Sequence, residues 1–297
     1  MNELFEISTD YSYTIIVILV IFAISLAFFT YFLFMLYDFR KKSDRKTYKN
    51  KDTLSAEVAY FSEIGMRERQ EDSFYISPLD DYLENGLFAC IADGMGGLED
   101  GHIISQYVVD EIEQLFPIEF ESGDYIARKI SQVSKRIYDK FKHKGGSTLA
   151  LVHIFDNKLH FYSVGDSNVI LIRKDRATIL NYKQNYVGEL IAKLSKQNIS
   201  TRDAYLSPEA PALVEFMGKR NVRVQYTRAP IKLIDGDYLV ICSDGVTDAL
   251  PVEHLNSLID STAKKTASNI KLNVSNKKLP RQDNYSAVII KLKRDLF

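Results

Sequence analysis

One uninterrupted apolar run near the start of the chain constrains its fold more than any other feature. Residues 13–37 read YTIIVILVIFAISLAFFTYFLFMLY and hold no charged side chain. A helix needs about 20 such residues to cross a bilayer, whereas a long helix of a soluble domain keeps a polar face. A cleaved signal peptide starts with basic residues and has a shorter apolar run, but this chain starts with Glu3, Glu6 and Asp10. We therefore expect an uncleaved transmembrane helix over residues 13–37.

The charges on the two sides of this run predict its orientation. Residues 1–12 contain no Lys or Arg, and residues 38–53 contain Arg40, Lys41, Lys42, Arg45, Lys46, Lys49 and Lys51. The positive-inside rule places such a basic flank in the cytoplasm. We expect a single-pass protein of the inner or plasma membrane, with an outer tail over 1–12, a basic juxtamembrane linker over 38–53 and a cytoplasmic domain over 54–297. The helix contacts membrane lipid, and the linker could also meet anionic headgroups.

Composition excludes several classes of function for the cytoplasmic part. The net charge of −1 gives no global argument for a nucleic-acid partner. Cys90 and Cys242 both stand in apolar runs, which favours buried thiols over a disulfide framework or a cysteine metal site. The five histidines are scattered without zinc spacing.

Strand-like and helix-like segments fall in separate clusters after residue 54. Apolar spacing predicts helices over 103–115, 124–141 and 187–196. Alternating or wholly apolar runs predict strands in AEVAYFSEIG, FACIAD, STLALVHIF, LHFYSV, NVILIRK, YLVICSD and SAVIIKL, with tight turns at Asp156-Asn157 and Gly165-Asp166-Ser167. Hairpin connections of this kind favour an α+β layered fold over a parallel βαβ sheet.

Acidic residues stand at strand ends or in tight loops at several places, namely Asp72, Asp93, Asp166, Asp244, Asp248 and Asp283. A single Asp-Gly after a strand is usually only a turn. Several such carboxylates can instead converge at one edge of a sheet sandwich, where they repel one another unless cations neutralise them. Oxygen ligands select Mg²⁺ or Mn²⁺ rather than zinc. Two such ions about 3.5–4 Å apart can activate water for attack on phosphorus.

Two further features suit a phosphate site of this kind. Arg67, five residues before Asp72, offers a planar fork for bidentate recognition of phosphoryl oxygens. Glycines at 94, 96 and 97 allow backbone carbonyls and water to approach the ions closely.

Six segments carry a family resemblance: GMRERQEDS, DGMGG, GGSTL, VGDSN, SDGVTD and DNYSA, in this order. Their order and spacing resemble the metal-dependent protein phosphatase 2C (PPM) family in its compact bacterial form, over roughly residues 54–292. The resemblance implies a four-layer αββα sandwich of two mostly antiparallel sheets flanked by helices. It also implies a centre of two Mn²⁺ or Mg²⁺ ions between the sheets, with a third ion in many members.

The resemblance assigns a ligand role to each matching position. Asp93 would bridge both ions and Gly94 would offer its backbone carbonyl, while Asp244 and Asp283 would complete the shell of one ion. Asp166 and Asp248 match positions that, together with Asp244, hold the third ion.

Catalysis would rest on Arg67, Asp72 and Asp93. Glu71 and Asp72 would hold metal-bound waters, and Arg67 would bind the substrate phosphate.

The chain also departs from the family pattern. Gln70 replaces the usual Asn, which keeps the amide on a longer arm. Leu98 and Met95 occupy the positions where relatives place a histidine, so the general acid is open: a metal-bound water or a nearby side chain such as His102, although a loop histidine is more often simply solvated. Slower turnover of phosphoserine and phosphothreonine than of activated esters would follow. Residues 181–226 correspond to the variable flap and match poorly.

The sequence thus predicts a membrane-anchored metal-dependent protein serine/threonine phosphatase that uses a dimetal-bridging water. Its partners would be phosphorylated Ser/Thr proteins and an opposing Ser/Thr kinase. One alternative is a catalytically weak or inactive phosphatase-like binding module, against which the intact Asp93, Asp244 and Asp283 argue. Another is a dinuclear nuclease or nucleotide phosphatase, which the position of the dense Lys/Arg runs, in the linker, does not favour.

Overall fold

The computed structural model describes the backbone of residues 2–47, 53–95, 101–118, 123–142, 144–187 and 212–294. The chain divides into two compact units, Met1–Lys51 and Asp52–Phe297. The expected helix over 187–196 lies outside the described residues, apart from its first residue.

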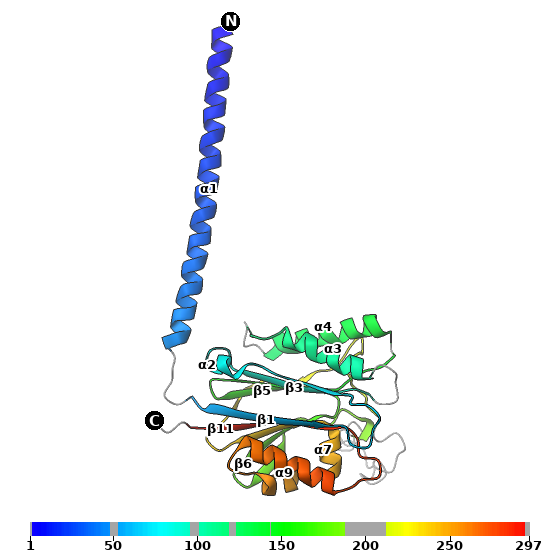
Figure 1. Ribbon diagram of the computed structural model, residues 1–297. Helices are drawn as coiled ribbons and strands as arrows, with labels where there is room; N and C mark the ends of the chain where they lie inside the picture. The colour runs from blue at the N-terminus through cyan, green and yellow to red at the C-terminus, as the bar shows by residue number, and fades with distance from the viewer. Residues whose placement is uncertain are drawn as a thin grey trace, which may run out of the picture. The chain divides into compact units, whose positions relative to one another are not determined.

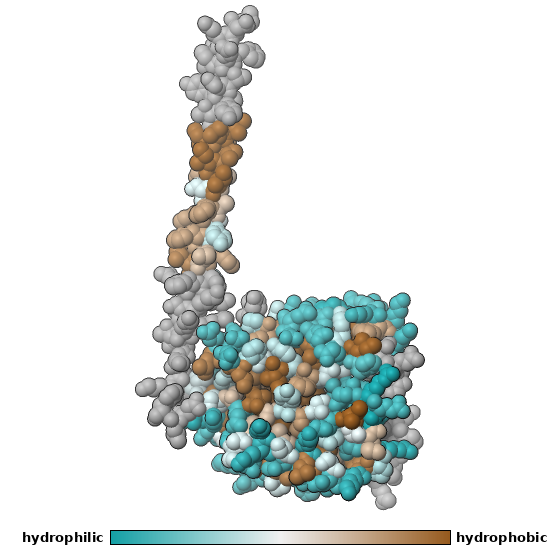
Figure 2. All heavy atoms as spheres, viewed as in Figure 1, coloured by the Kyte–Doolittle hydropathy of each residue, from teal (hydrophilic) through white to brown (hydrophobic). Residues whose placement is uncertain are grey.

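The first unit contains a single described helix, α1 (Asn2–Thr47). Its segment Ile15–Tyr37 is long and apolar enough to cross a membrane, with a mean hydropathy of 2.8 and no burial of its side chains. Figure 2 shows these exposed, mostly hydrophobic side chains along the helix. Because α1 continues to Thr47, the first ten residues of the predicted linker are helical.

The second unit is built from two antiparallel sheets (Figure 1). The first sheet has the order β1 (Ser55–Glu63), β11 (Tyr285–Lys293), β10 (Tyr238–Cys242), β6 (Asn168–Arg173) and β7 (Arg176–Ile179). The second has the order β2 (Asp72–Ile76), β3 (Leu87–Asp93), β4 (Leu149–Phe155), β5 (Lys158–Val164) and β8 (Gln225–Tyr226), and β9 (Ile231–Lys232) also pairs with β5.

Helices cover the outer faces of both sheets. The second sheet carries α3 (Gly101–Glu113) and α4 (Gly123–Phe141), and the first carries α7 (Asp244–Ala249), α8 (Val252–Leu255) and α9 (Ala263–Asn276). Shorter elements are η1 (Leu79–Asp81), α2 (Tyr82–Asn85) and η2 (Asn256–Leu258). The order helices, sheet, sheet, helices is the predicted αββα sandwich (Figure 1).

Burial on two sides explains the wholly apolar strands. In β3, Ala89 and Ile91 point into the core between the sheets, while Phe88 and Cys90 point into the core under α3 and α4. A strand buried on both faces has no reason to alternate with polar residues. Cys90 and Cys242 are buried free thiols, as the sequence predicts.

Tight turns and an amphipathic helix complete the second sheet. Asp156 and Asn157 both have positive φ, at 48° and 57°, so β4 and β5 are joined by the predicted two-residue hairpin. On α4, Ile126, Ile130 and Ile137 are buried against the sheet at helical spacing.

Candidate active site

Two antiparallel pairings bring the predicted acidic residues to one edge of the sandwich. In the second sheet, Asp72 is the first residue of β2 and lies directly opposite Asp93, the last residue of β3. These two carboxylates therefore share one end of one sheet because neighbouring antiparallel strands start and end together.

The first sheet contributes three further acidic residues, which stand near the ends of its strands. Its strand β10 ends at Cys242, which pairs with Asn168 at the start of β6. Asp244 opens α7 directly after β10, and Asp166 stands in the turn before β6. Asp283 lies two residues before β11, on the other side of β10.

The charges of carboxylates in both sheets act on Asp93. Burial raises the pKa of Asp93 well above its usual range, and the charges of Asp72, Asp244, Asp166 and Asp283 raise it further. These contributions come from both sheets, so carboxylates of both sheets act on Asp93. Buried carboxylates that raise one another's pKa are costly to ionise unless cations neutralise them.

Two other members of the cluster show the same effect. Burial raises the pKa of Asp72 to about 6, although hydrogen bonds from Ser286 and Ser243 oppose the shift. Burial also raises the pKa of Asp244 to about 7, with further upward contributions from Asp166 and other neighbouring carboxylates.

The donor set fits hard divalent cations. Oδ2 of Asp72 accepts a hydrogen bond from Ser243 at 2.8 Å, whereas the buried Oδ1 has no hydrogen-bond partner among the described residues. A Cβ at position 94 would come 2.4 Å from the carbonyl oxygen of Gly101, so only glycine fits there. Buried carboxylate oxygens beside a side-chain-free backbone are the surroundings that Mg²⁺ or Mn²⁺ prefer.

The side chains are not arranged as a closed ligand shell. Over the described ranges, no three Asp, Glu, His or Cys side chains lie close enough together to hold an ion. Asp283 instead pairs with Arg67 at 2.6 Å, and Asp248 lies 3.8 Å from the ammonium of Lys183. Asp283 and Asp248, two carboxylates that the resemblance assigns to ions, are thus paired with cationic side chains.

Glu71 lies at the rim of the cluster. Its pKa is raised chiefly by burial, and the charges of Arg67 and His102 lower it. His102, the second residue of α3, is therefore close to the site. Gly96, Gly97 and Leu98, three positions of the predicted Gly-rich loop, lie outside the described residues.

Sequence reasoning missed the residues that position the carboxylates. Ser243 donates to Asp72 and accepts a hydrogen bond from the backbone of Ser286, which joins the two sheets. Asn284 accepts from the backbone of Glu71 at 2.9 Å and donates to the carbonyls of Ile64 and Arg69. Ser243 belongs to the motif SDGVTD and Asn284 to the motif DNYSA. The sequence therefore marked both positions, but it gave no indication of the hydrogen bonds that these side chains form.

Gln70, whose side chain is longer than that of Asn, also helps to position the carboxylates. Its carbonyl oxygen accepts from the backbone of Asp72 at 3.1 Å, and its amide donates to Ser62 at 2.8 Å. The replacement of Asn by Gln is thus accommodated.

Lys183 is a second residue that the sequence did not indicate. Its charge lowers the pKa of Asp166 and of Asp244 while its ammonium lies near Asp248. It belongs to the segment 181–226 that matches the family poorly, so no motif drew attention to it.

Comparison with known proteins finds serine/threonine phosphatases among the relatives of this chain. The chain is 22% identical to the protein phosphatase PhpP of Streptococcus pneumoniae over 216 residues, which cover 69% of this chain and 85% of the relative. It is 27% identical to the serine/threonine phosphatase stp of Listeria innocua over 190 residues, covering 60% of this chain and 73% of the relative.

Solved structures share the fold. The serine/threonine phosphatase Stp1 from Staphylococcus aureus superposes with a TM-score of 0.69 at 18% identity, over 81% of this chain and 96% of that one. The catalytic domain of PstP in complex with two manganese ions superposes with a TM-score of 0.63 at 21% identity, over 81% of this chain and 100% of that one. The family profile described as protein phosphatase 2C matches residues 64–282. Since that match covers most of the chain, the protein belongs to the protein phosphatase 2C family and has the protein-serine/threonine phosphatase activity of that family.

Proposed function

We propose that this phosphatase is anchored in the cell membrane by α1, faces the cytoplasm with residues 54–297, and removes phosphate from phosphoserine and phosphothreonine in a reaction that requires Mn²⁺ or Mg²⁺. Its partners are then phosphorylated proteins near the membrane and the serine/threonine kinase that phosphorylates them. The assignment of a kinase rests on the chemistry alone, since a phosphoprotein substrate requires an enzyme that adds the phosphate.

The observation that carries the metal requirement is the set of carboxylates that raise the pKa of Asp93. Asp72 and Asp93 come from one sheet, and Asp166, Asp244 and Asp283 from the edge of the other. A fold gains nothing in stability from such a buried cluster of like charges, so its retention points to cation binding.

Each residue then has a distinct role. Asp93, the backbone carbonyl of Gly94, Asp244 and Asp283 would hold two ions. Asp166 and Asp248, with Asp244, would hold a third. When bound, the ions supply a water activated for in-line attack on phosphorus and neutralise charge on the phosphoryl oxygens.

The remaining side chains orient the reactants. Arg67 presents its guanidinium to two phosphoryl oxygens in the bidentate geometry that arginine favours. Asp72 and Glu71 accept hydrogen bonds from ordered waters at the site, and Ser243 holds Asp72 in place through its 2.8 Å hydrogen bond.

Hydrolysis of p-nitrophenyl phosphate and of a phosphothreonine peptide by the full chain in detergent tests the proposal. Activity is expected with Mn²⁺ or Mg²⁺ and is expected to disappear with a chelator. Asp244→Asn should reduce kcat by more than the roughly 10–100-fold that loss of an outer-shell partner costs. Asp175→Asn, at an exposed turn between β6 and β7, is the matched control and should keep full activity.

The outcomes separate the alternatives. Full-length protein that folds but shows no metal-dependent hydrolysis would support the inactive binding module. Hydrolysis of oligonucleotides in preference to the phosphopeptide would support the dinuclear nuclease.

Anchoring and orientation need a separate test. In spheroplasts or inverted vesicles, a cysteine placed in the tail 1–12 should react with an impermeant maleimide only from outside, because the native Cys90 and Cys242 are buried. The cytoplasmic domain should be digested by protease only in inverted vesicles. Extraction of the chain by alkaline carbonate would contradict the anchor.

A further inference from the structure

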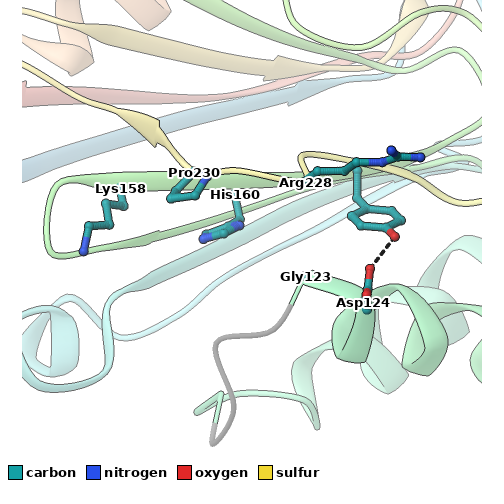
Figure 3. Close-up of a pocket in the computed structure, with 7 residues that line it drawn as sticks. Gly123, Asp124, Lys158, His160, Arg228 and Pro230 are labelled. Atoms are coloured by element: carbon teal, nitrogen blue, oxygen red, sulfur yellow. Dashed lines mark hydrogen bonds between the residues drawn. The ribbon is translucent and has the colours of Figure 1, made fainter.

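A cleft of about 700 Å³ opens beside β5, but its cationic side chains diverge. Arg228 extends away from Lys158 and His160, and the hydroxyl of Tyr226 donates to Asp124 (Figure 3). Polar side chains converge instead at the catalytic edge, where two series of hydrogen bonds lead to Asp72.

The first series holds the carboxylate of Asp72. Its Oδ2 accepts a hydrogen bond from Ser243, which follows β10, at 2.8 Å. The hydroxyl of Ser243 accepts from the backbone N–H of Ser286 in β11 at 3.0 Å, and the N–H of Ser243 donates to the carbonyl of Ser286 at 3.1 Å. Ser243 and Ser286 are both 0% exposed. Because a buried polar group without a partner is costly, each of these bonds constrains the next.

The second series holds the backbone of Asp72. Its N–H donates to the side-chain carbonyl of Gln70 at 3.1 Å, and the amide of Gln70 donates to the hydroxyl of Ser62 at 2.8 Å. Ser62 is the penultimate residue of β1 and lies directly opposite Ser286 in β11. The hydroxyl of Ser286 donates to that of Ser62 at 2.9 Å.

Ser62 therefore joins the two series into one closed ring of hydrogen bonds. From the carboxylate of Asp72 back to its own N–H, the ring runs through Ser243, Ser286, Ser62 and Gln70. Linked hydrogen bonds polarise one another, so loss of one member weakens the others. Among the described residues, Ser62 forms no hydrogen bond to Asp72, and its influence on that carboxylate passes through Gln70 and Ser286.

We propose that Ser62 is a positioning residue of this phosphatase, which fixes the orientation of the Asp72 carboxylate through this ring. Ser62 lies outside the six family segments. The inference rests on the proposed function, in which Asp72 accepts hydrogen bonds from ordered waters at the metal site. Removal of an orienting partner of this kind typically costs about 10–100-fold in metal affinity or activity, whereas a purely structural role would change stability and leave kcat as it is.

Replacement of the hydroxyl in the full chain, in detergent, tests the proposal. Ser62→Ala should lower kcat for p-nitrophenyl phosphate by about ten-fold or more while KM stays within about two-fold, because Arg67 and not Asp72 receives the phosphate. Binding of Mn²⁺ without substrate, measured by electron paramagnetic resonance, should weaken by about ten-fold. Ser62→Thr keeps the hydroxyl and should keep both values near those of the parent.

The same strand supplies a matched control. Ser55 opens β1, lies directly opposite Lys293 in β11 and donates from its hydroxyl to the carbonyl of Lys293 at 3.1 Å. It stands about 23 Å along the strand from Ser62, since each residue adds about 3.3 Å. Ser55→Ala removes a serine hydroxyl bonded across the same pair of strands, and it should leave both kcat and the Mn²⁺ affinity unchanged.

A double-mutant cycle distinguishes a ring from separate contacts. Gln70→Ala opens the ring from outside β1 and should by itself lower kcat by about ten-fold. Once the ring is open, Ser62→Ala should add less than about two-fold to that loss. Losses that multiply would show that Ser62 and Gln70 act separately, and would overturn the ring.

The remaining outcomes separate the ring from the proposed function. Thermal unfolding followed by circular dichroism identifies the variants that fold. Parental kcat or parental Mn²⁺ affinity in a folded Ser62→Ala chain would overturn the ring alone, as would an equal loss in Ser55→Ala or in Ser62→Thr. A parent chain that binds Mn²⁺ but hydrolyses no phosphate ester would refute the proposed function itself.

Discussion

Arg67 donates a hydrogen bond from Nη2 to Oδ2 of Asp283 at 2.6 Å, across 216 residues of sequence. The contact joins the proposed phosphate-binding arginine to a proposed metal ligand, and both side chains are partly exposed, at 48% and 40%. If Asp283 takes an ion, it loses lone pairs to that ion and Arg67 is released to receive phosphate. Loading of the site and recognition of substrate are then coupled through one carboxylate.

Replacement of Arg67 should therefore separate substrate binding from ion binding. Arg67→Ala is expected to raise KM for a phosphothreonine peptide by about ten-fold or more, because a charged hydrogen bond to phosphate is lost. The same variant should bind Mn²⁺ at least as tightly as the parent, as judged by equilibrium dialysis. Arg176→Ala, which removes an exposed arginine of β7, is the control. Weaker Mn²⁺ binding in Arg67→Ala would contradict the competition.

Removal of divalent ions should give the fold an unusual pH dependence. In chelator, the raised pKa values of Asp244, about 7, and of Asp93 mean that the native state binds more protons than the unfolded chain. Stability conferred by their protonated forms is then present at lower pH and lost as the pH rises through the folded pKa. We expect the free energy of unfolding to fall by about 1 kcal/mol per unit between pH 6.5 and 8.

The range from pH 6.5 to 8 excludes the opposite effect of His153 on stability. Burial lowers the pKa of His153 to about 4, so its contribution to stability is lost only as the pH falls below about 6.5. Urea unfolding at several pH values measures the slope. Asp244→Asn should flatten the slope in chelator, and Mn²⁺ should reverse its sign because ions bind the ionised carboxylates. A parent protein whose stability rises with pH in chelator would show that the cluster is already neutralised.

Lys183 should act as a built-in competitor of the third ion. Its ammonium lies 3.8 Å from Asp248 and lowers the pKa of Asp166. Lys183→Met removes that charge and should tighten the weakest Mn²⁺ site by at least about three-fold. Titration of free Mn²⁺ by electron paramagnetic resonance gives the stoichiometry and affinity independently of activity. Lys264→Met is the matched control, and an unchanged weakest site in Lys183→Met would reject the competition.

The leaving group should reveal whether His102 donates a proton. Its charge lowers the pKa of Glu71, and its buried Nδ1 has no hydrogen-bond partner among the described residues. We expect His102→Gln to slow hydrolysis of a phosphothreonine peptide by about 10²-fold, the low end of what proton transfer contributes. Hydrolysis of p-nitrophenyl phosphate, whose leaving group needs no proton, should stay within about two-fold. His254→Gln, on the helices of the other sheet, serves as the control. Equal losses for both esters would assign the proton to water.

Much of the fold could be predicted because local physics decides it. The apolar run that becomes Ile15–Tyr37 of α1, the helices α3 and α4, and the hairpin at Asp156-Asn157 each follow from periodicity or turn chemistry within a few residues. Cys90 and Cys242 are buried because their strands are apolar throughout.

The candidate site was predictable only as a set of acidic positions. Asp72, Asp93, Asp166, Asp244 and Asp283 stand out because each ends a strand or a loop, and motif order relates them to a known family. Their supporting contacts run between distant segments, as Ser243 to Asp72 and Asn284 to Glu71 do. No local pattern indicates such partners.

The sequence by itself determined which segments become strands and helices, which end of the chain can cross a membrane, and which carboxylates stand at strand ends. Only the tertiary structure decided that Arg67 meets Asp283 and that Lys183 lies by Asp248. The reason is physical. Periodicity and turn chemistry act over a few residues. Contacts between charged side chains depend instead on how whole sheets stack, and a local sequence pattern does not predict which distant side chains this stacking brings together.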